Sequence, residues 1–136
     1  FVGPSPSTTP RSLELAKAYL AAFQSLPATS YYQSGFDAAE LLFRAIEQTA
    51  VRLGDGGTLI GREALRRALY ASANVEGVTG VLNCDQFGDC ANPRFNVLRL
   101  TIPEEGIEGL QKNVQFTYAP LQRDAASSPG TPQARQ

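Results

Sequence analysis

Two residues in this sequence have side chains and a spacing that could do chemistry, Cys84 and Cys90, which bracket the segment Asp-Gln-Phe-Gly-Asp. A structural zinc site needs four ligands, and the chain offers 2 cysteines and no histidine. A redox centre of the thioredoxin kind needs Cys-x-x-Cys at a helix start, whereas a longer, turn-like segment intervenes here. A disulfide across a turn and two free thiols remain as interpretations.

We favour the disulfide between Cys84 and Cys90. The segments before and after the pair look extended, and a hairpin turn can bring two Cα atoms within the roughly 4.4–6.8 Å that a disulfide requires. Closing so short a loop would stabilise the fold by about 2 kcal/mol in the loop-entropy description. Such a bond predicts an oxidising compartment outside the cytoplasm.

The rest of the sequence offers little catalytic chemistry. The absence of histidine removes the usual general base and the usual activator of a Ser or Cys nucleophile. Asp85 and Asp89 lack the alternating ligands and the terminal Glu of a calcium loop. A nucleophilic Cys84 or Cys90 is the enzyme alternative, and it would have no histidine beside it. We therefore predict that the chain is not an enzyme and holds no metal or cofactor.

Composition sets further bounds on the function. The chain has 136 residues, one domain's worth, and its 12 Lys and Arg residues balance 13 Asp and Glu residues. This balance excludes the basic footprint expected for nucleic-acid or anionic-membrane binding. No apolar run reaches the length of a membrane span, and no export signal is visible. Because the chain has no Met, we expect a processed chain or a fragment.

Three helices are predicted, and they would position the candidate residues named above. Thr9 as N-cap and Pro10 at the first helical position predict a helix through residue 26, with an apolar stripe facing a core. Ser34 and Asp37 resemble a capping box that opens a helix over residues 36–54, ended by Gly-Asp-Gly-Gly. We expect Phe36, Leu42 and Ile46 of that helix in the core. A third helix is predicted over residues 61–73, with its arginines on the exposed side.

The predicted strands are few. Residues 1–3 read as the end of a strand, residues 31–32 lie in a short β-prone segment, and further strands are predicted over residues 78–82, 95–102 and 114–120. Residues 121–136 lack hydrophobic content, which predicts a disordered tail. This inventory indicates an α/β protein whose pieces do not complete a sheet by themselves.

Four motifs occur in a fixed order along the chain. They are Phe36-Asp37-Ala38, then Leu41-Leu42 with Ala45-Ile46, then Arg-Glu-x-Leu-Arg-x-Ala-Leu over residues 62–69, then Gly77 and Gly80 before the Gly88-Asp89 turn. This pattern resembles the C-terminal third of the type I periplasmic solute-binding proteins, which deliver amino acids, amides and related solutes to ABC transporters. The resemblance spans roughly residues 1–102. Gly61 departs from it, because a Ser or Thr often caps the third helix of that family.

The resemblance implies the C-terminal part of a two-lobed α/β fold, incomplete on its own. Residues 1–28 would finish lobe two, residues 31–92 would return to lobe one, and residues 95–120 would cross back. The missing N-terminal lobe would then be a partner of this segment, and its exposed edges predict self-association of the isolated chain. Some family members carry a Cys on each side of the Gly-Asp turn.

The resemblance also implies a function, which is the capture of a small solute, such as an amino acid or amide, between the lobes for an ABC transporter permease. The alternative is a ligand-sensing domain of a transmembrane receptor or kinase with the same fold. A periplasmic or extracellular location follows, and the resemblance also allows a membrane anchor upstream of Phe1.

Tyr31, with Tyr32 beside it, is the candidate solute contact, because family members can reach the cleft from this position and tyrosine offers both an apolar face and a hydroxyl. The alternative is that one tyrosine packs in the core and the other faces solvent. We interpret Asp37 as a helix-start carboxylate and Asp89 as a turn residue, in preference to ligand contacts. In that family, the residues that mainly bind the α-amino and carboxylate groups of the solute lie upstream of the segment that this chain resembles.

Overall fold

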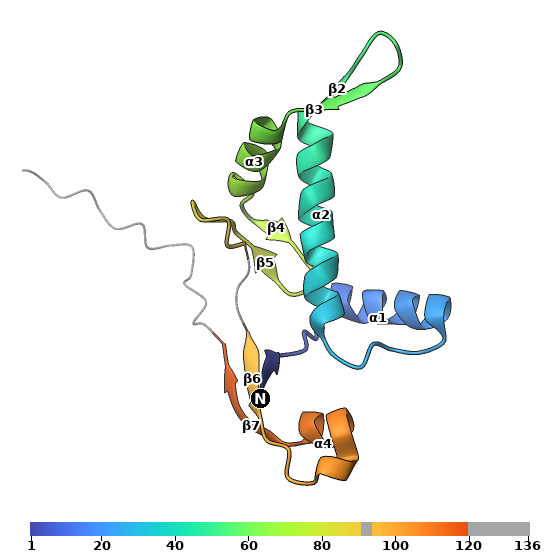
Figure 1. The fold of residues 1–136 in the computed structure, drawn as a ribbon, viewed down its shortest axis with the longest axis vertical. Helices are drawn as coiled ribbons and strands as arrows, with labels where there is room; N and C mark the ends of the chain where they lie inside the picture. Colours follow the sequence, from blue (N-terminus) through green and yellow to red (C-terminus); the bar gives the residue numbers. More distant parts are fainter. Residues whose placement is uncertain (91–93, 120–136) are drawn as a thin grey trace, which may run out of the picture.

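A computed structural model describes residues 1–90 and 94–119, so the predicted tail at residues 121–136 lies outside the described residues (Figure 1). Four α-helices and seven short strands are present in the described part. The helices are α1 (Pro10–Phe23), α2 (Tyr31–Thr49), α3 (Arg62–Tyr70) and α4 (Gly106–Lys112), with a 3-10 turn η1 (Pro103–Glu105). The strands are β1 (Val2–Pro4), β2 (Ala50–Arg52), β3 (Thr58–Ile60), β4 (Val75–Glu76), β5 (Val81–Leu82), β6 (Phe95–Leu98) and β7 (Val114–Tyr118).

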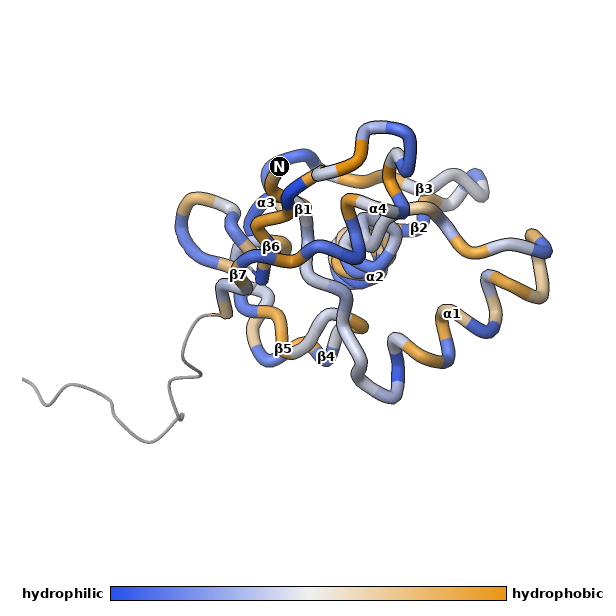
Figure 2. The backbone as a smooth tube through the Cα atoms, turned by 90° about the horizontal axis from the view of Figure 1, so that it is seen from below, coloured by the Kyte–Doolittle hydropathy of each residue, from blue (hydrophilic) through white to orange (hydrophobic). Residues whose placement is uncertain are grey.

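Helix α1 begins as the sequence predicts and packs differently. The Thr9 hydroxyl accepts a hydrogen bond from the Ser12 amide at 3.1 Å, and Pro10 occupies the first helical position. The predicted apolar stripe, however, is exposed, and Phe23 is 63% accessible. The reason is visible in Figures 1 and 2, where α1 runs outward from the base of α2 with no other described element over its outer part.

Helix α2 begins at Tyr31, earlier than predicted, so the predicted β-prone segment and capping box are both wrong. Ser34 lies inside the helix, and the Asp37 side chain is used in a tertiary contact. The buried stripe of α2 follows steps of four residues through Gln33, Asp37, Leu41 and Ala45.

The predicted core of α2 lies on the wrong side of the helix. Phe36 and Leu42 are 41% and 39% exposed, and Ile46 is half-buried. The hydrophobic periodicity of α2 therefore follows a face that is largely exposed in the described part, while its inward face carries polar side chains at two of four positions.

Two β-hairpins lie where the sequence predicted the end of a helix and a single strand. Helix α2 ends at Thr49 rather than at the Gly-Asp-Gly-Gly segment, and β2 and β3 form an antiparallel hairpin around that segment. Gly56 sits in its turn at a φ of +87°, which only glycine adopts without strain. Likewise, the predicted strand at residues 78–82 is a hairpin of β4 and β5, in which Val78 lies in the turn.

Strands β1, β6 and β7 form an antiparallel sheet in that spatial order. Val97 of β6 lies between Val2 and Phe116, and Phe95 lies between Pro4 and Tyr118. Strand β7 was predicted, whereas the strand expected over residues 95–102 ends at Leu98, and the short helix α4 was not predicted. A 3-10 turn begins at Pro103, which cannot donate to a sheet ladder.

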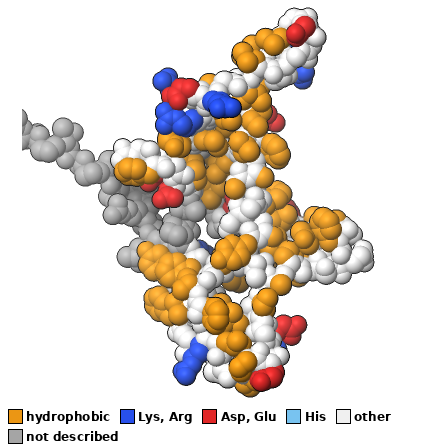
Figure 3. All heavy atoms as spheres, in the orientation of Figure 1, with side chains coloured by type: hydrophobic (Ala, Val, Ile, Leu, Met, Phe, Trp, Pro, Cys, Tyr) orange, Lys and Arg blue, Asp and Glu red, His pale blue; other side chains and the backbone are white. Residues whose placement is uncertain are grey.

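The apolar core of the described part is small. Only four hydrophobic side chains are buried in residues 1–90 and 94–119, those of Leu41, Ala45, Val78 and Leu82. Large hydrophobic side chains are instead exposed along α1, α2, α4 and most strands, and Figure 3 shows them spread over the visible face. Across the described ranges, no helix has the length and apolar character needed to cross a membrane.

Candidate functional site

A hollow of about 480 Å³ opens between β1, the segment joining α1 to α2, and helix α4. Residues 1–4 and 6, residues 26–32, two residues of β6, three of α4 and one of β7 line it. Its volume lies in the range of small-molecule pockets, about 300–1,000 Å³. The hollow is therefore large enough for a solute of amino-acid size.

The chemistry of this hollow is neutral and mostly apolar. Apolar side chains such as Leu26, Leu98 and Ile107 surround it, and Asn96 and Gln111 contribute amide groups. No Asp, Glu, Lys or Arg side chain is among its described lining residues. The hollow can bury an apolar group and hydrogen-bond a neutral one, but it offers no charged side chain to a carboxylate or an ammonium group.

Both tyrosines that the sequence singles out line the hollow. They occupy the first turn of α2, so their directions follow helical geometry rather than the alternation of a strand. Tyr31 is 61% exposed, and Tyr32 is half-buried with its ring 5.8 Å from that of Tyr19. The structure therefore brings the two residues to one concave surface, and their contact with a solute stays a prediction.

Polar contacts fix the wall of the hollow on which the tyrosines stand. The Ser30 hydroxyl donates to the Pro4 carbonyl at 2.7 Å, just before α2. Within the first turn of the helix, the Gln33 side-chain amide accepts from the Ser7 backbone amide at 2.8 Å and donates to the Ser7 carbonyl at 3.2 Å. The Gln111 amide donates to the Ala28 carbonyl across the hollow. Because Ser7 and Gln33 are buried, these bonds lock the start of α2 to the segment after β1.

Asp37 is neither a helix-start carboxylate nor a residue of the hollow. It is 4% exposed, and its carboxylate accepts from the Val78 amide at 2.6 Å, the Thr79 amide at 2.9 Å and the Thr79 hydroxyl. The turn between β4 and β5 is thereby clamped onto α2. The four-residue spacing of Gln33, Asp37 and Leu41 is the one sequence signal that could have revealed this buried stripe and its two polar residues.

A second polar link joins the start of α1 to α2. The Arg11 guanidinium forms an ion pair with Glu40 at 3.0 Å and also donates to the Glu76 carbonyl, and Arg44 binds the other Glu40 oxygen at 3.0 Å. Partial burial pushes the pKa of Glu40 upward, but the hydrogen bonds from Arg44 and Arg11 outweigh it and hold that pKa below its ordinary value. Sequence reasoning missed this link because it joins residues far apart in the chain.

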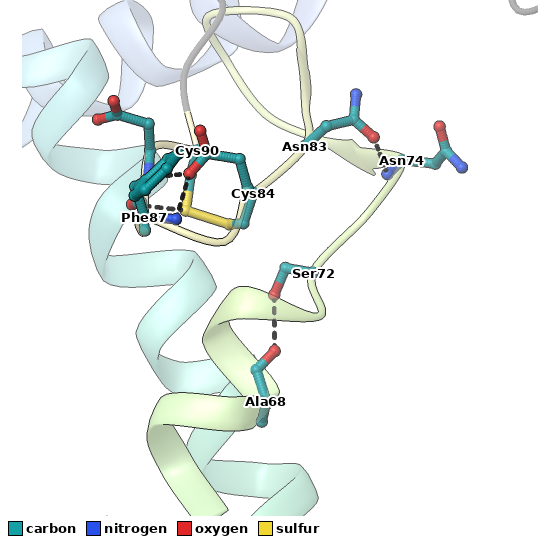
Figure 4. The surroundings of a disulfide bond; sticks show 10 residues. Ala68, Ser72, Asn74, Asn83, Cys84, Phe87 and Cys90 are labelled. Carbon is teal, nitrogen blue, oxygen red and sulfur yellow. Dashed lines mark hydrogen bonds between the residues drawn. A yellow bond between two sulfur atoms is a disulfide. The ribbon is translucent and has the colours of Figure 1, made fainter. Parts of the chain in front are cut away.

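Cys84 and Cys90 are joined by a disulfide (Figure 4). The Asp85 carboxylate accepts from the Phe87 and Asp89 amides at 2.8 and 3.0 Å, so Asp85, rather than Asp89, organises the turn. The Cys84 amide also donates to the Ser72 carbonyl, which ties the loop to the end of α3. With both sulfurs bonded to each other, neither thiol is free to act as a nucleophile.

Comparison with known proteins gives a likeness in structure and none in sequence. No protein-family model matches the sequence, and no curated protein matches it. Among solved structures, the chain resembles LivK, a leucine-binding protein from Thermotoga maritima, with a TM-score of 0.54 and 22% identity over 72% of this chain. The chain spans 26% of the length of that protein. The likeness shows the fold: the described residues are a mixed α/β structure that matches part of the type I periplasmic-binding-protein fold.

Proposed function

We propose that this chain is part of an extracytoplasmic solute-binding protein, which holds a small amino acid or amide between two lobes for an ABC importer. The match in fold to a leucine-binding protein carries the proposal. The disulfide supports a periplasmic or extracellular location, because such bonds persist in oxidising compartments. In this proposal residues 1–28 finish lobe two, residues 31–92 belong to lobe one, and residues 95–120 cross back, although residues 91–93 and 120 lie outside the described ranges.

The hollow at the start of α2 is the part of the solute site that this chain would supply. Tyr31 and Tyr32 would place aromatic rings against the apolar part of the solute. Since no charged side chain lines the hollow, the groups that pair with the solute's carboxylate and ammonium would come from the rest of the protein. The exposed apolar faces of the described part would pack against the missing N-terminal lobe, and the permease would bind the closed protein.

Solute binding by the complete protein, produced with its upstream coding region, tests the proposal. Isothermal titration with amino acids and their amides should identify a bound class, and a solute present at 100 times its dissociation constant should stabilise the protein by about 2.7 kcal/mol. Tyr31→Ala should weaken binding at least about tenfold, as expected for the loss of a buried aromatic contact.

Phe43→Ala is the matched control, because Phe43 is equally accessible, at 62%, and lies on the same helix outside the hollow. Tyr32→Phe separates the hydroxyl of Tyr32 from its ring. If no solute binds, or if Tyr31→Ala and Phe43→Ala bind alike, the hollow has no role in solute capture.

A further inference from the structure

The floor of the hollow is one face of the β1-β6-β7 sheet, which lies next to α4 in Figure 1. Residues paired across strands share a face of the sheet. Four residues line the hollow from this floor: Gly3, Asn96, Leu98 and Val114. Val114 joins them because the pairing of β7 with β6 skips Gln115. Of these four residues only Asn96 has a polar side chain, and it is half-buried.

The Asn96 amide group faces the hollow mainly as a hydrogen-bond donor. Its Oδ1 atom accepts a hydrogen bond at 2.8 Å from the hydroxyl of Thr117, its cross-strand neighbour on β7. Within residues 1–90 and 94–119 this is the hydrogen bond that the Asn96 side chain makes, so the two N–H groups of its Nδ2 atom are left for another partner. The second amide of the hollow, that of Gln111, already donates to the Ala28 carbonyl.

The space beside Asn96 suits an uncharged group. Gly3, its neighbour on β1, has no side chain, and a Cβ atom added there would meet only Leu98 within 4 Å, apart from the chain neighbours of Gly3. The Phe1 amino group borders the hollow but donates to the Leu98 carbonyl at 2.9 Å. Because no charged side chain is among the described lining residues, a carboxylate or ammonium group on this floor would lose hydration without gaining an ionic partner.

From this donor on an otherwise apolar, uncharged floor, we infer that the hollow binds the side chain of the solute and selects a neutral side chain that ends in a hydrogen-bond acceptor, such as a carboxamide. The carbon chain of the solute lies against Leu98 and Val114, and its terminal oxygen accepts from the Asn96 Nδ2 group. An alkyl side chain would leave these N–H groups without a partner. Asn96 is thereby the specificity-determining residue. The inference rests on the proposed function, since the rest of the protein must bind the α-amino and carboxylate groups.

Isothermal titration of the complete protein with glutamine, norleucine and glutamate tests the selection. Norleucine has an unbranched apolar side chain of similar length, and glutamate carries a charged carboxylate in place of the amide. Glutamine should bind at least about tenfold more tightly than either, because each of the others leaves a buried polar or charged group unpaired.

Asn96→Leu separates the amide group from the shape of the floor. This variant should weaken glutamine binding at least about tenfold and leave norleucine binding within about twofold, which also shows that it is folded. Asn83→Leu is the matched control, because the Asn83 side chain likewise accepts one hydrogen bond, from the Asn74 amide at 2.9 Å, and lies outside the hollow. It should leave both affinities unchanged. Gly3→Val, which fills the space beside Asn96, should weaken the binding of all three probes.

The outcomes separate this inference from the proposed function. A protein that binds no amino acid refutes the proposed function, and this inference with it. A protein that binds an amino acid with an apolar or charged side chain at least as tightly as glutamine retains the proposed function and overturns the selection. Equal losses of glutamine and norleucine affinity in Asn96→Leu would show that Asn96 supports the hollow without distinguishing solutes, which overturns the inference as well.

Discussion

Replacing Asp37 should strongly destabilise the chain, because three hydrogen bonds from the β4–β5 turn end on its buried carboxylate. A hydrogen bond to a charged group contributes about 1.5–3 kcal/mol. The three are coupled, and the cost of burying the carboxylate offsets part of the gain. We therefore expect Asp37→Ala to lower the free energy of unfolding by about 3–4 kcal/mol. Asp37→Asn should cost about 2–3 kcal/mol, because its amide group would meet an N–H donor.

Gly77 lies beside this clamp and allows a sharper test. A Cβ atom on Gly77 would lie 2.7 Å from an Asp37 carboxylate oxygen. Because that carboxylate is held by its hydrogen bonds, it cannot move aside, and Gly77→Ala should cost about 1–3 kcal/mol. In an Asp37→Ala background the obstacle is gone. The cost of Gly77→Ala should then fall close to zero, which gives a coupling energy of about 1–3 kcal/mol.

The original chain, Asp37→Ala, Gly77→Ala and the double variant form a double-mutant cycle, and urea denaturation followed by circular dichroism measures the stability of all four. Glu47→Gln, which removes the same charge from an exposed position on α2, is the control for Asp37→Asn and should change stability by less than about 0.5 kcal/mol. Additive effects of Asp37→Ala and Gly77→Ala would refute the contact. Equal stabilities of Asp37→Asn and Glu47→Gln would refute the clamp itself.

Two further predictions concern α3 and the loop after β5. Hydrogen bonds from Arg66 and Arg67 lower the pKa of Glu63 to about 2. The ion pairs of Glu63 should therefore stabilise the fold above the ordinary Glu pKa and be lost as pH falls toward 2. A carboxyl NMR titration should show a higher Glu63 midpoint in the Arg66→Ala/Arg67→Ala variant. Replacing Cys84 and Cys90 by Ser should lower the free energy of unfolding by about 2 kcal/mol, as loop closure over so few residues predicts. Urea denaturation with and without reductant measures this change. An unchanged stability would show that the bond does not constrain the unfolded chain.

The sequence predicted elements best where one residue type determines local backbone geometry. Thr9 and Pro10 define the start of α1, because a hydroxyl cap and a missing N–H need no tertiary partner. The cysteine pair was predictable for the same reason, since the loop between the two residues is short. Helix α3 lies close to its expected range, with Leu65 half-buried, and it packs against α2.

Prediction failed where distant residues decide the structure. Ser34 and Asp37 have the spacing of a capping box, yet Asp37 bonds to a turn about forty residues further along the chain. The buried stripe of α2 is polar at two of its four positions, so hydrophobic periodicity placed Phe36 on the wrong side. Tyr31 and Tyr32 were chosen as a pair on a strand, and they reach the same hollow from the first turn of a helix.

The polar character of these contacts bears on how the chain reaches a stable state. Ser7, Ser12, Gln33 and Asp37 are buried and hydrogen-bonded, so they fix the geometry of α1, α2 and the β4–β5 turn. Such bonds contribute only about 1 kcal/mol each in net stability when neutral, whereas burying a large apolar side chain contributes about 1.5–3 kcal/mol. With few apolar side chains buried in the described ranges, these polar contacts determine how the elements are arranged, but stability must come from covering the exposed apolar faces. Under the proposed function, the missing lobe would cover most of them.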